Sequence, residues 1–455
     1  MTSAEDSPGV SRNLATVVLL VQSMLLGGGL FAIGWLSPEW APDTRSYAQF
    51  PLTEPVEAAK HIRTYGYPLF LAVGAVENYR YIPLMHFVVH VVAVISVYAA
   101  LISWSYPPWM SAFIASGTLW SLTLMRCAKL LTPDCVAHSL GVIAVAMLMM
   151  LVVRRRATCW VGVGLAVLLG YQLRPAYLFL VPLIPLLGAL LDWWRTPASG
   201  AGIRSSLAFS GRLAATTFIP LLLFASYRFV LVGHFGLVAF GGYNATGVVS
   251  QFLQVEHVEQ LPESVQELAR RGLERRAELY ADRGWSDQPT MSYRLIEDRF
   301  DANTWQIFVP VAREMWPDDR LEVNRRLARL AKSTALLRSK QYGIWLFKAG
   351  VRGVYLLFAE LILNLFVAIL WPTLAVRYLV RVRRHAALLS QGGELPARAD
   401  FVSVPLLIAV TYALCNVGFI IITTPPLGRF VDPAGVWFPA VLAALVCQVG
   451  HIRRT

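Results

Sequence analysis

Apolar residues in this chain come in long runs that are separated by short polar segments. Runs of about 17–25 apolar residues predict helices that cross a lipid bilayer. Ten candidate spans can be marked, at 14–36, 82–103, 108–125, 133–153, 157–172, 175–192, 213–233, 346–371, 403–422 and 433–450. The fifth and sixth are short, and the sequence YQLRP at 171–175 between them is typical of a tight turn at a membrane surface. The pattern predicts an all-α polytopic membrane protein with about ten transmembrane helices.

Composition supports this class and argues against others. Of the 455 residues, 56% are hydrophobic and 15% are charged, whereas soluble domains have about 25% charged residues. The net charge of +12 requires no nucleic-acid partner, because the basic residues concentrate in short loops between spans. The first apolar run lacks a small-residue cleavage site, so we expect it to remain as a span and not to be a cleaved signal peptide.

The charges of the loops also predict which side each loop faces. If ten spans alternate and the N-terminus is inside, the inner segments hold fourteen arginines and five acidic residues, which follows the positive-inside rule. The outer segments are then 37–81, 126–132, 171–174, 234–345 and 423–432. Nearly all polar residues that can do chemistry fall in them. We therefore expect a functional site on the outer side of a cell (inner) membrane.

Two outer segments are large enough to form structure of their own. In 37–81, four apolar residues are spaced for one helical face, which predicts a short interfacial helix over 52–63: Leu52, Val56, Ala59 and Ile62. The segment 234–345 has a soluble composition, and its periodicity predicts helices over 255–280, 293–315 and 320–340. The expected order is an N-terminal transmembrane module, an outer helical domain and a C-terminal transmembrane module, over 1–233, 234–345 and 346–455.

Asp43 follows the first span directly, in the sequence SPEWAPDTRSY at 37–47, with Tyr47 one helical turn later. A carboxylate at this depth can act as a general base for an acceptor hydroxyl, or as a ligand for a divalent cation near a phosphate. It can also cap a helix or pair with Arg45. The polar residues that follow favour the functional interpretation.

The sequence KHIRTYGYPLF at 60–70 places three potential cations before an aromatic Gly-Pro break. On a helix, Lys60 and Arg63 would share one face, which suits a phosphate or anionic headgroups. An ordinary interfacial helix, with its basic side chains extended toward water, explains the pattern equally well.

A second carboxylate, Asp134, opens the fourth span in the sequence LTPD at 131–134. Proline at a first helical position and an acid near the positive end of the helix dipole describe an ordinary helix start. Asp134 is nevertheless expected on the same surface as Asp43. Two carboxylates at one surface can divide the roles of base and ligand.

Arg174 and Arg429 are expected at the outer surface, against the positive-inside bias. The guanidinium fork of arginine suits a phosphate well. The alternatives are side chains extended toward the headgroups, or an internal ion pair between Arg429 and Asp432.

Three further patterns favour structural roles. His86 and His90 share a helical face, but no third ligand follows in sequence, so polar contacts between helices are favoured over a metal site. The glycine-rich sequence GGYNATG at 241–247 lacks the residues of a phosphate-binding loop and suits a flexible entry to the outer domain. The five cysteines lie in or beside apolar segments, which favours buried free thiols over zinc ligands, although a Cys127–Cys135 bridge stays open.

Together these residues resemble the GT-C class of membrane glycosyltransferases, which are polytopic enzymes that take a sugar from a polyprenyl-phosphate carrier on the outer face. The resemblance rests on an Asp just after the first span, an interfacial helix and the sequence GYPLF at 66–70. The sequence TPD at 132–134 looks like the second acidic position of the class. The turn at 174–175 and the stretch 429–433 also look like recurring features of it. The resemblance covers roughly residues 1–180 and identifies no subfamily.

The resemblance implies a direct, inverting transfer of sugar to an acceptor hydroxyl, with Asp43 as base and Asp134 orienting the acceptor or binding a cation. It implies that the donor phosphate lies among basic side chains, and here we expect Lys60, Arg63, Arg174 and Arg429. We expect further substrate contacts from Tyr47, His61, Tyr65 and Tyr67. The expected partners are a lipid-linked sugar donor, a glycan, lipid or protein acceptor, and membrane lipids. The class often has adjacent acids in the first loop, whereas this chain has Asp43-Thr44, so a need for Mg²⁺ or Mn²⁺ stays open.

Other functions fit the same pattern less well. A transporter or flippase of lipid-linked sugars commonly shows paired repeats and ionisable residues at mid-membrane depth. No repeat is visible here, and the spans are nearly free of charge at their centres, with Glu360 as the one exception. A polymerase or ligase of lipid-linked glycans would use the same chemistry. A scaffold without enzymatic activity would leave the outer polar residues unexplained.

Overall fold

A computed structural model describes residues 8–75, 77–196, 200–238, 240–289, 291–390 and 400–450. Within these ranges all regular secondary structure is helical, and the only β-type pairing is an isolated bridge between Glu39 and Leu130. The predicted all-α class is therefore confirmed for the described part of the chain.

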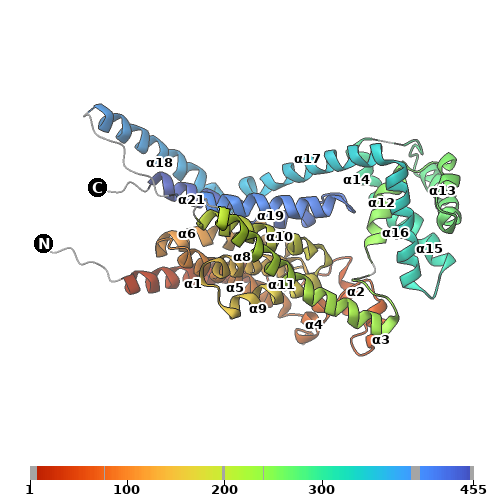
Figure 1. The fold of residues 1–455 in the computed structure, drawn as a ribbon, viewed down its shortest axis with the longest axis horizontal. Helices are drawn as coiled ribbons and strands as arrows, with labels where there is room; N and C mark the ends of the chain where they lie inside the picture. The colour runs from red at the N-terminus through yellow and green to blue at the C-terminus, as the bar shows by residue number, and fades with distance from the viewer. Residues whose placement is uncertain are drawn as a thin grey trace.

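Nine of the described helices form one elongated bundle (Figure 1). Its members are α1 (Pro8–Ala32), α5 (Ile82–Ser103), α6 (Pro108–Leu119), α8 (Asp134–Arg154), α9 (Ala157–Leu173), α10 (Leu180–Arg195), α11 (Gly200–Val232), α19 (Ser403–Ile421) and α21 (Phe438–Gly450). The central helix is α8, which packs against α5, α9 and α10. Its side chains are buried nearly all round, as expected of a helix that is apolar on every face.

Seven described helices are long and apolar enough to cross a membrane, or eight when a bent pair counts as one span. The count of ten is not confirmed. The expected fifth span forms α9, an apolar helix of only 17 residues. The expected third span forms α6, with 12 residues, followed by a second short helix, α7 (Leu122–Cys127).

The expected eighth span, 346–371, is interrupted by a sharp bend. The chain forms α17 (Ser339–Leu363) and α18 (Leu365–Ser390), which are bent by 77° at Asn364. The side-chain oxygen of Asn364 accepts a hydrogen bond of 2.9 Å from the backbone N–H of Phe366. Asparagine in this position begins a new helix, because its side chain satisfies a backbone donor that the first helical turn leaves free. An apolar run alone does not reveal such a break.

The loops expected on the two sides of the membrane lie at opposite ends of the bundle. The start of α1 and the end of α21 lie at one end, while α2, α3 and α4 lie at the other (Figure 1). Contacts within the first end include a hydrogen bond of 3.2 Å from the Tyr106 hydroxyl to the carbonyl of Phe401 and an ion pair between Arg155 and Asp192. The polar residues singled out above gather at the second end.

A group of shorter helices lies beyond this second end, and α17 extends from the bundle toward it (Figure 1). Its members are α12 (Gly241–Val249), α13 (Glu263–Asp282), α14 (Tyr293–Ala302), α15 (Val309–Met315) and α16 (Arg320–Leu337). They have an apolar core of their own, which includes Tyr243, Phe308 and Leu327. The helical character expected for this part of the chain is confirmed.

The glycine-rich sequence at 241–247 is not a flexible entry, contrary to the expectation above. It forms most of α12, which packs closely against α16. A side chain on Gly242 would overlap the backbone of Asn324 and Ala328. A side chain on Gly247 would overlap the Thr304 hydroxyl and the Phe300 ring. These glycines therefore permit close helix packing and do not loosen the chain.

We expect Gly247→Ala to lower the free energy of unfolding by about 1–3 kcal/mol, the usual range for an overpacked core. The matched control is Gly241→Ala at the start of the same helix, where an added methyl group meets nothing within 4 Å. Thermal unfolding of the purified protein in detergent measures both changes. A Gly247→Ala protein as stable as the control would contradict the packing described here.

The interfacial helix expected over 52–63 is shorter than predicted. The first outer loop contains α2 (Thr44–Ala48), α3 (Pro55–Lys60) and α4 (Gly66–Val73). Only six residues are helical in α3, which packs against α11. The predicted apolar face is correct only in part, because Ala59 is buried but Val56 is exposed and the buried Ala58 lies outside it. Contacts with α11 decide which side of this helix is covered.

Candidate functional site

Asp43 lies at the first position before α2, but its side chain does not cap that helix. One carboxylate oxygen accepts a hydrogen bond from Arg63 at 3.0 Å, and the other pairs with Arg429 at 3.1 Å. Arg45, the alternative partner considered from the sequence, donates instead to Gln49 at 3.2 Å. Both expected ordinary roles, a cap and a pair with Arg45, are therefore absent.

The pKa of Asp43 is lowered from its ordinary value. Burial by itself would raise it, but the charges of Arg63 and Arg429 and the hydrogen bond from Arg63 outweigh burial. Because the folded-state pKa is depressed, these pairs stabilise the fold above the unfolded-state pKa and lose that effect as pH falls through the folded-state value. Asp43 is thus ionised throughout the neutral range.

Arg63 connects several parts of the first outer loop. Its Nε donates to the Ser46 hydroxyl at 2.9 Å, and its Nη1 donates to the Tyr47 hydroxyl at 3.1 Å. Its guanidinium also lies 4.6 Å from the centre of the Tyr47 ring. Burial raises the pKa of Tyr47, so its hydroxyl keeps its proton at neutral pH. Arg63 therefore bonds to side chains of α2 and to Asp43 at the same time.

Asp134 is held differently, at the start of α8. It forms an ion pair with Arg174, and the Thr132 hydroxyl donates to its second oxygen at 2.9 Å. Both members of the pair are nearly buried, with side-chain exposures of 11% for Arg174 and 6% for Asp134. Asp134 therefore lies at the start of its helix, as the sequence predicts. It also pairs with a buried arginine.

The two carboxylates belong to one network. Arg174 donates to the backbone carbonyl of Arg429 at 3.4 Å, and Arg429 in turn pairs with Asp43. We call these residues the ion-pair cluster: Asp43, Arg63, Asp134, Arg174 and Arg429. Four separate segments of the chain contribute to it, at the same end of the bundle.

A short backbone pairing explains why Asp43 and Asp134 lie near each other. The N–H of Glu39 donates to the carbonyl of Lys129 at 2.8 Å, and the N–H of Leu131 donates to the carbonyl of Glu39 at 2.9 Å. The Thr44 hydroxyl adds a bond of 3.0 Å to the carbonyl of Leu131. This pairing joins the loop after the first span to the residues that precede Asp134.

The structure brings some predicted residues into the cluster and leaves others out. Lys60 pairs with Glu57 at 2.9 Å on the exposed side of α3. Because α3 ends at Lys60, that residue and Arg63 do not share a helical face, contrary to the prediction. Tyr65 points elsewhere as well, since its hydroxyl donates to the carbonyl of Pro55 at 3.2 Å.

Tyr67 and His61 lie beside the cluster without joining it. The buried Tyr67 ring packs edge-on against the Tyr47 ring, with 5.2 Å between the ring centres. The His61 ring packs against the Phe50 ring, with 4.9 Å between the ring centres. Its Nδ1 accepts a hydrogen bond of 3.0 Å from the backbone N–H of Arg63. Burial, together with the charges of Arg320 and Arg63, lowers the pKa of His61 to about 4. This histidine is therefore uncharged at neutral pH and is not one of the cations expected from the sequence.

The sequence analysis missed one ion pair beside the cluster. Arg126 pairs with Asp432 at 2.6 Å, so Asp432 is not the partner of Arg429. No sequence spacing links positions so far apart. The pair ties the segment before Asp134 to the segment that carries Arg429.

His86 and His90 make polar contacts between helices, as predicted. The His86 ring bonds the carbonyl of Ala128 at 2.9 Å, and the His90 ring bonds the carbonyl of Thr118 at 3.0 Å. Within the described ranges no group of three His, Cys, Asp or Glu residues could hold a metal ion. All five cysteines are free, with Cys127 and Cys135 buried, so the bridge between them is not formed.

No protein-family model, curated protein or solved structure matches this chain. The geometry of the cluster therefore carries the functional argument. It combines two carboxylates, which can accept protons, with three guanidinium groups, which can bind an anion.

Proposed function

We propose that this protein is a membrane glycosyltransferase of the GT-C type. It would move a sugar from a polyprenyl-phosphate donor to an acceptor hydroxyl. The observation that supports this proposal is the ion-pair cluster, in which Asp43 and Asp134 share three arginines at one end of the bundle. A reaction that releases a lipid phosphate and deprotonates a hydroxyl requires both kinds of group in one place.

In this proposal the arginines bind the phosphate of the donor. The cluster contains three positively charged guanidinium groups and two carboxylates. Its net charge is therefore positive, and it can attract an anion. Arginine binds phosphate through parallel hydrogen bonds, and such contacts strengthen as negative charge develops on the leaving group. Arg63 and Arg429 are the most suitable, because Asp43, the partner they share, is only partly buried.

Asp43 would then act as the base. Paired with two arginines it has a low pKa and accepts protons poorly. When those arginines bind the donor phosphate instead of Asp43, the pKa of Asp43 rises toward the range in which a base is effective. The acceptor oxygen attacks the anomeric carbon and transfers its proton to Asp43. The bond from that carbon to the phosphate oxygen breaks, and the configuration of the sugar inverts.

Asp134 has a supporting role in this scheme. Its ion pair with Arg174 and its hydrogen bond from Thr132 fix its position. From there it can orient the acceptor, or supply an oxygen ligand to Mg²⁺ or Mn²⁺ together with the donor phosphate. The rings of Tyr47 and Phe430 pack against arginines of the cluster, and Tyr67 packs against Tyr47.

The proposal also assigns the ends of the bundle to the two sides of a cell membrane. Arginine-rich loops belong to the cytoplasmic side by the positive-inside rule. The cluster and the helices α12–α16 then belong to the outer side, with α6 and α9 as short spans in a total of ten. Helices α12–α16 would cover the site and exclude water during transfer.

A transporter of lipid-linked sugars is the second candidate, because broken helices are typical of transporter sites. The break between α17 and α18 lies next to the buried Glu360. However, the carboxylate of Glu360 accepts the N–H of Leu122 at 2.8 Å and the amide of Asn364 at 3.1 Å. Both carboxylate oxygens of Glu360 therefore accept hydrogen bonds from the protein, one at the start of α7 and one from the side chain of Asn364. This favours a structural role for Glu360. A polymerase or ligase of lipid-linked glycans would use the cluster in the same way as the proposed enzyme.

The test is sugar transfer by the purified protein in detergent. Radiolabelled polyprenyl-phosphate mannose, glucose and arabinose would each be supplied with a membrane extract as the source of acceptors. We expect release of the lipid phosphate together with labelled product from at least one donor. Movement of an intact donor across proteoliposomes without cleavage would instead support the transporter.

A further inference from the structure

Three aromatic rings of the outer helices lie beside the ion-pair cluster. Phe240 directly precedes α12, Tyr243 lies in its first turn, and Trp305 lies in the segment Asn303–Phe308 between α14 and α15. The three ring centres are 5.9, 6.0 and 6.1 Å apart, and the ring planes differ by 18°, 36° and 28°. In a single stack the first and third rings would be much further apart than neighbouring rings. The rings therefore lie side by side, and we call them the aromatic patch.

Trp305 is the open part of the aromatic patch. It is 38% exposed, whereas Tyr243 is buried and Phe240 is half-buried. The segment that carries Trp305 is a π-helix, a rare widened turn that is frequent at functional sites. Ile307 and Phe308 of the same segment are buried in the core of these helices. The segment thus presents Trp305 to the outside, where tryptophan is a common binding residue.

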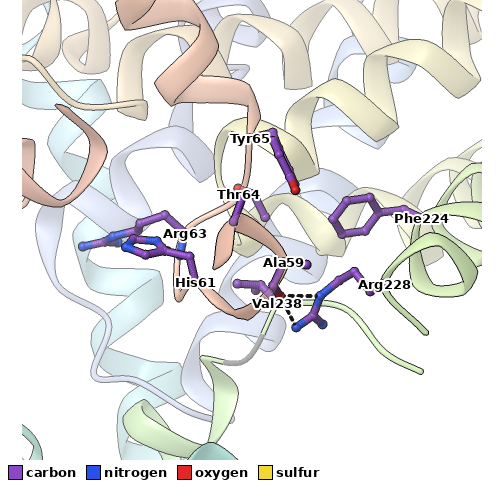
Figure 2. Close-up of a pocket in the computed structure, with 9 residues that line it drawn as sticks. Ala59, His61, Arg63, Thr64, Tyr65, Phe224, Arg228 and Val238 are labelled. Carbon is purple, nitrogen blue, oxygen red and sulfur yellow. Dashed lines mark hydrogen bonds between the residues drawn. The ribbon is translucent and has the colours of Figure 1, made fainter. Parts of the chain in front are cut away.

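Arg63 connects the aromatic patch to the cluster. Its guanidinium lies 5.6 Å from the centre of the Phe240 ring and donates to Asp43 at 3.0 Å. His61 and Arg63 border a small pocket, and both side chains extend away from Arg228 on its far side (Figure 2). A molecule on the patch therefore lies next to the arginine that holds Asp43.

Polar side chains surround the aromatic patch. Burial raises the pKa of Tyr243, and the charges of Arg313 and Arg320 act against burial, so both arginines lie close to its ring. Burial and the charge of Arg320 also lower the pKa of His61. Arg320 thus lies between the first outer loop and the patch. Both arginines are exposed, and their N–H groups can donate to the oxygens of a ligand.

Aromatic rings with hydrogen-bond donors at their edge suit a sugar. One face of a sugar ring carries C–H groups with partial positive charge, which the negative face of an aromatic ring attracts. The hydroxyl oxygens of the same sugar accept hydrogen bonds from arginine. A lipid chain has no acceptors for these donors. The patch also lies in helices beyond the end of the bundle (Figure 1), where a lipid chain would be exposed to water.

We propose that the aromatic patch binds a glycan chain, which is the acceptor of the reaction. One sugar ring packs on Trp305, and the chain continues past Phe240 so that a hydroxyl of its end reaches Asp43. This inference rests on the proposed glycosyltransferase function and narrows the acceptor to a glycan. In the transfer the bond from the anomeric carbon to the phosphate oxygen breaks, and a bond from that carbon to the acceptor oxygen forms. The acceptor proton passes to Asp43, and the lipid phosphate leaves. The enzyme would thus extend an existing chain of sugars.

Binding of oligosaccharides to the full chain tests the patch without any donor. Mannohexaose, maltohexaose and arabinohexaose would be titrated into the protein in lauryldimethylamine oxide, a detergent without sugar, and followed by saturation-transfer NMR. We expect saturable binding of at least one. Trp305→Ala should weaken it about ten-fold or more, as for a base that loses its aromatic stacking partner. Trp305→Phe keeps a ring and should retain most of the binding.

Trp193→Ala is the matched control, because it removes an exposed tryptophan at the opposite end of the bundle. It should bind the oligosaccharide as tightly as the wild-type protein does. The inference would be overturned if none of the three oligosaccharides binds. It would equally be overturned if Trp305→Ala binds as tightly as Trp193→Ala.

Transfer kinetics separates this inference from the proposed function. In a protein that transfers sugar, Trp305→Ala should raise KM for the glycan acceptor about ten-fold and leave KM for the donor unchanged. An unchanged KM for the acceptor, or transfer to a lipid or protein only, would overturn the glycan acceptor and leave the glycosyltransferase in place. Trp305-dependent binding in a protein that transfers no sugar would count against the proposed function and not against the glycan-binding patch.

Discussion

Asp43→Asn is expected to reduce sugar transfer about 100- to 10,000-fold, the usual contribution of a general base. Asparagine has nearly the same shape, and its single side-chain oxygen can accept from Arg63 or from Arg429, which bond different oxygens of Asp43. It cannot take the proton of the acceptor. The loss should therefore fall on kcat, while KM for the donor stays within a few-fold. Steady-state kinetics with whichever polyprenyl-phosphate sugar supports transfer provides the measurement.

The matched control for this change is Glu57→Gln, which neutralises an exposed carboxylate of the same loop. Glu57 pairs with Lys60 outside the cluster, and its loss should leave transfer unchanged. Asp43→Asn loses two partly exposed ion pairs, so it should unfold at a somewhat lower temperature than the wild-type protein. A cooperative thermal transition well above the assay temperature separates a catalytic defect from a folding defect. Transfer at the wild-type rate by a folded Asp43→Asn protein would remove Asp43 from the mechanism.

Arg174→Met is expected to lower the free energy of unfolding by about 3–5 kcal/mol, because it leaves the buried carboxylate of Asp134 without its partner. Methionine fills much of the space of the arginine stem, so the charge and not a cavity dominates the effect. Asp134→Asn in the same chain removes the unpaired charge and should recover a large part of the loss. Unfolding in increasing concentrations of SDS measures all three proteins.

Arg45→Met is the control for this series, since Arg45 is an exposed arginine that contacts only Gln49. Its effect should lie within about 0.5 kcal/mol, as for most surface substitutions. If Arg174→Met and Arg45→Met are equally stable, the Asp134–Arg174 pair does not contribute to the fold. If the double variant is no more stable than Arg174→Met, lost packing explains the effect and the unpaired charge does not.

The sequence predicted the candidate site only as far as loop charges assign its residues to one surface. Asp43, Asp134, Arg174 and Arg429 were expected at one surface from loop charges, and the structure links them in one network. Lys60 and Arg63 show the limit of such reasoning. Their spacing suits a helical face, but α3 ends at Lys60 and sends the two side chains to different partners.

Errors in the predicted elements have two causes. The run 346–371 looks like one span, and the glycines at 241–247 look like a flexible linker. In the structure the side chain of Asn364, which bonds the N–H of Phe366, divides the first into two helices. Close packing of α12 leaves no room for a side chain on Gly242, against α16, or on Gly247, against Phe300 and Thr304. The first error comes from a local cap, and the second from contacts with distant residues.

By itself the sequence determined the class of this protein, the position of most helices and the surface that holds its polar residues. These properties follow from local rules, because backbone groups in lipid must bond within their own helix and basic loops remain on one side of the membrane. Only the tertiary structure decided which arginine meets which carboxylate. Such pairings join segments that lie far apart in the chain, and packing rather than sequence spacing sets the distances between them.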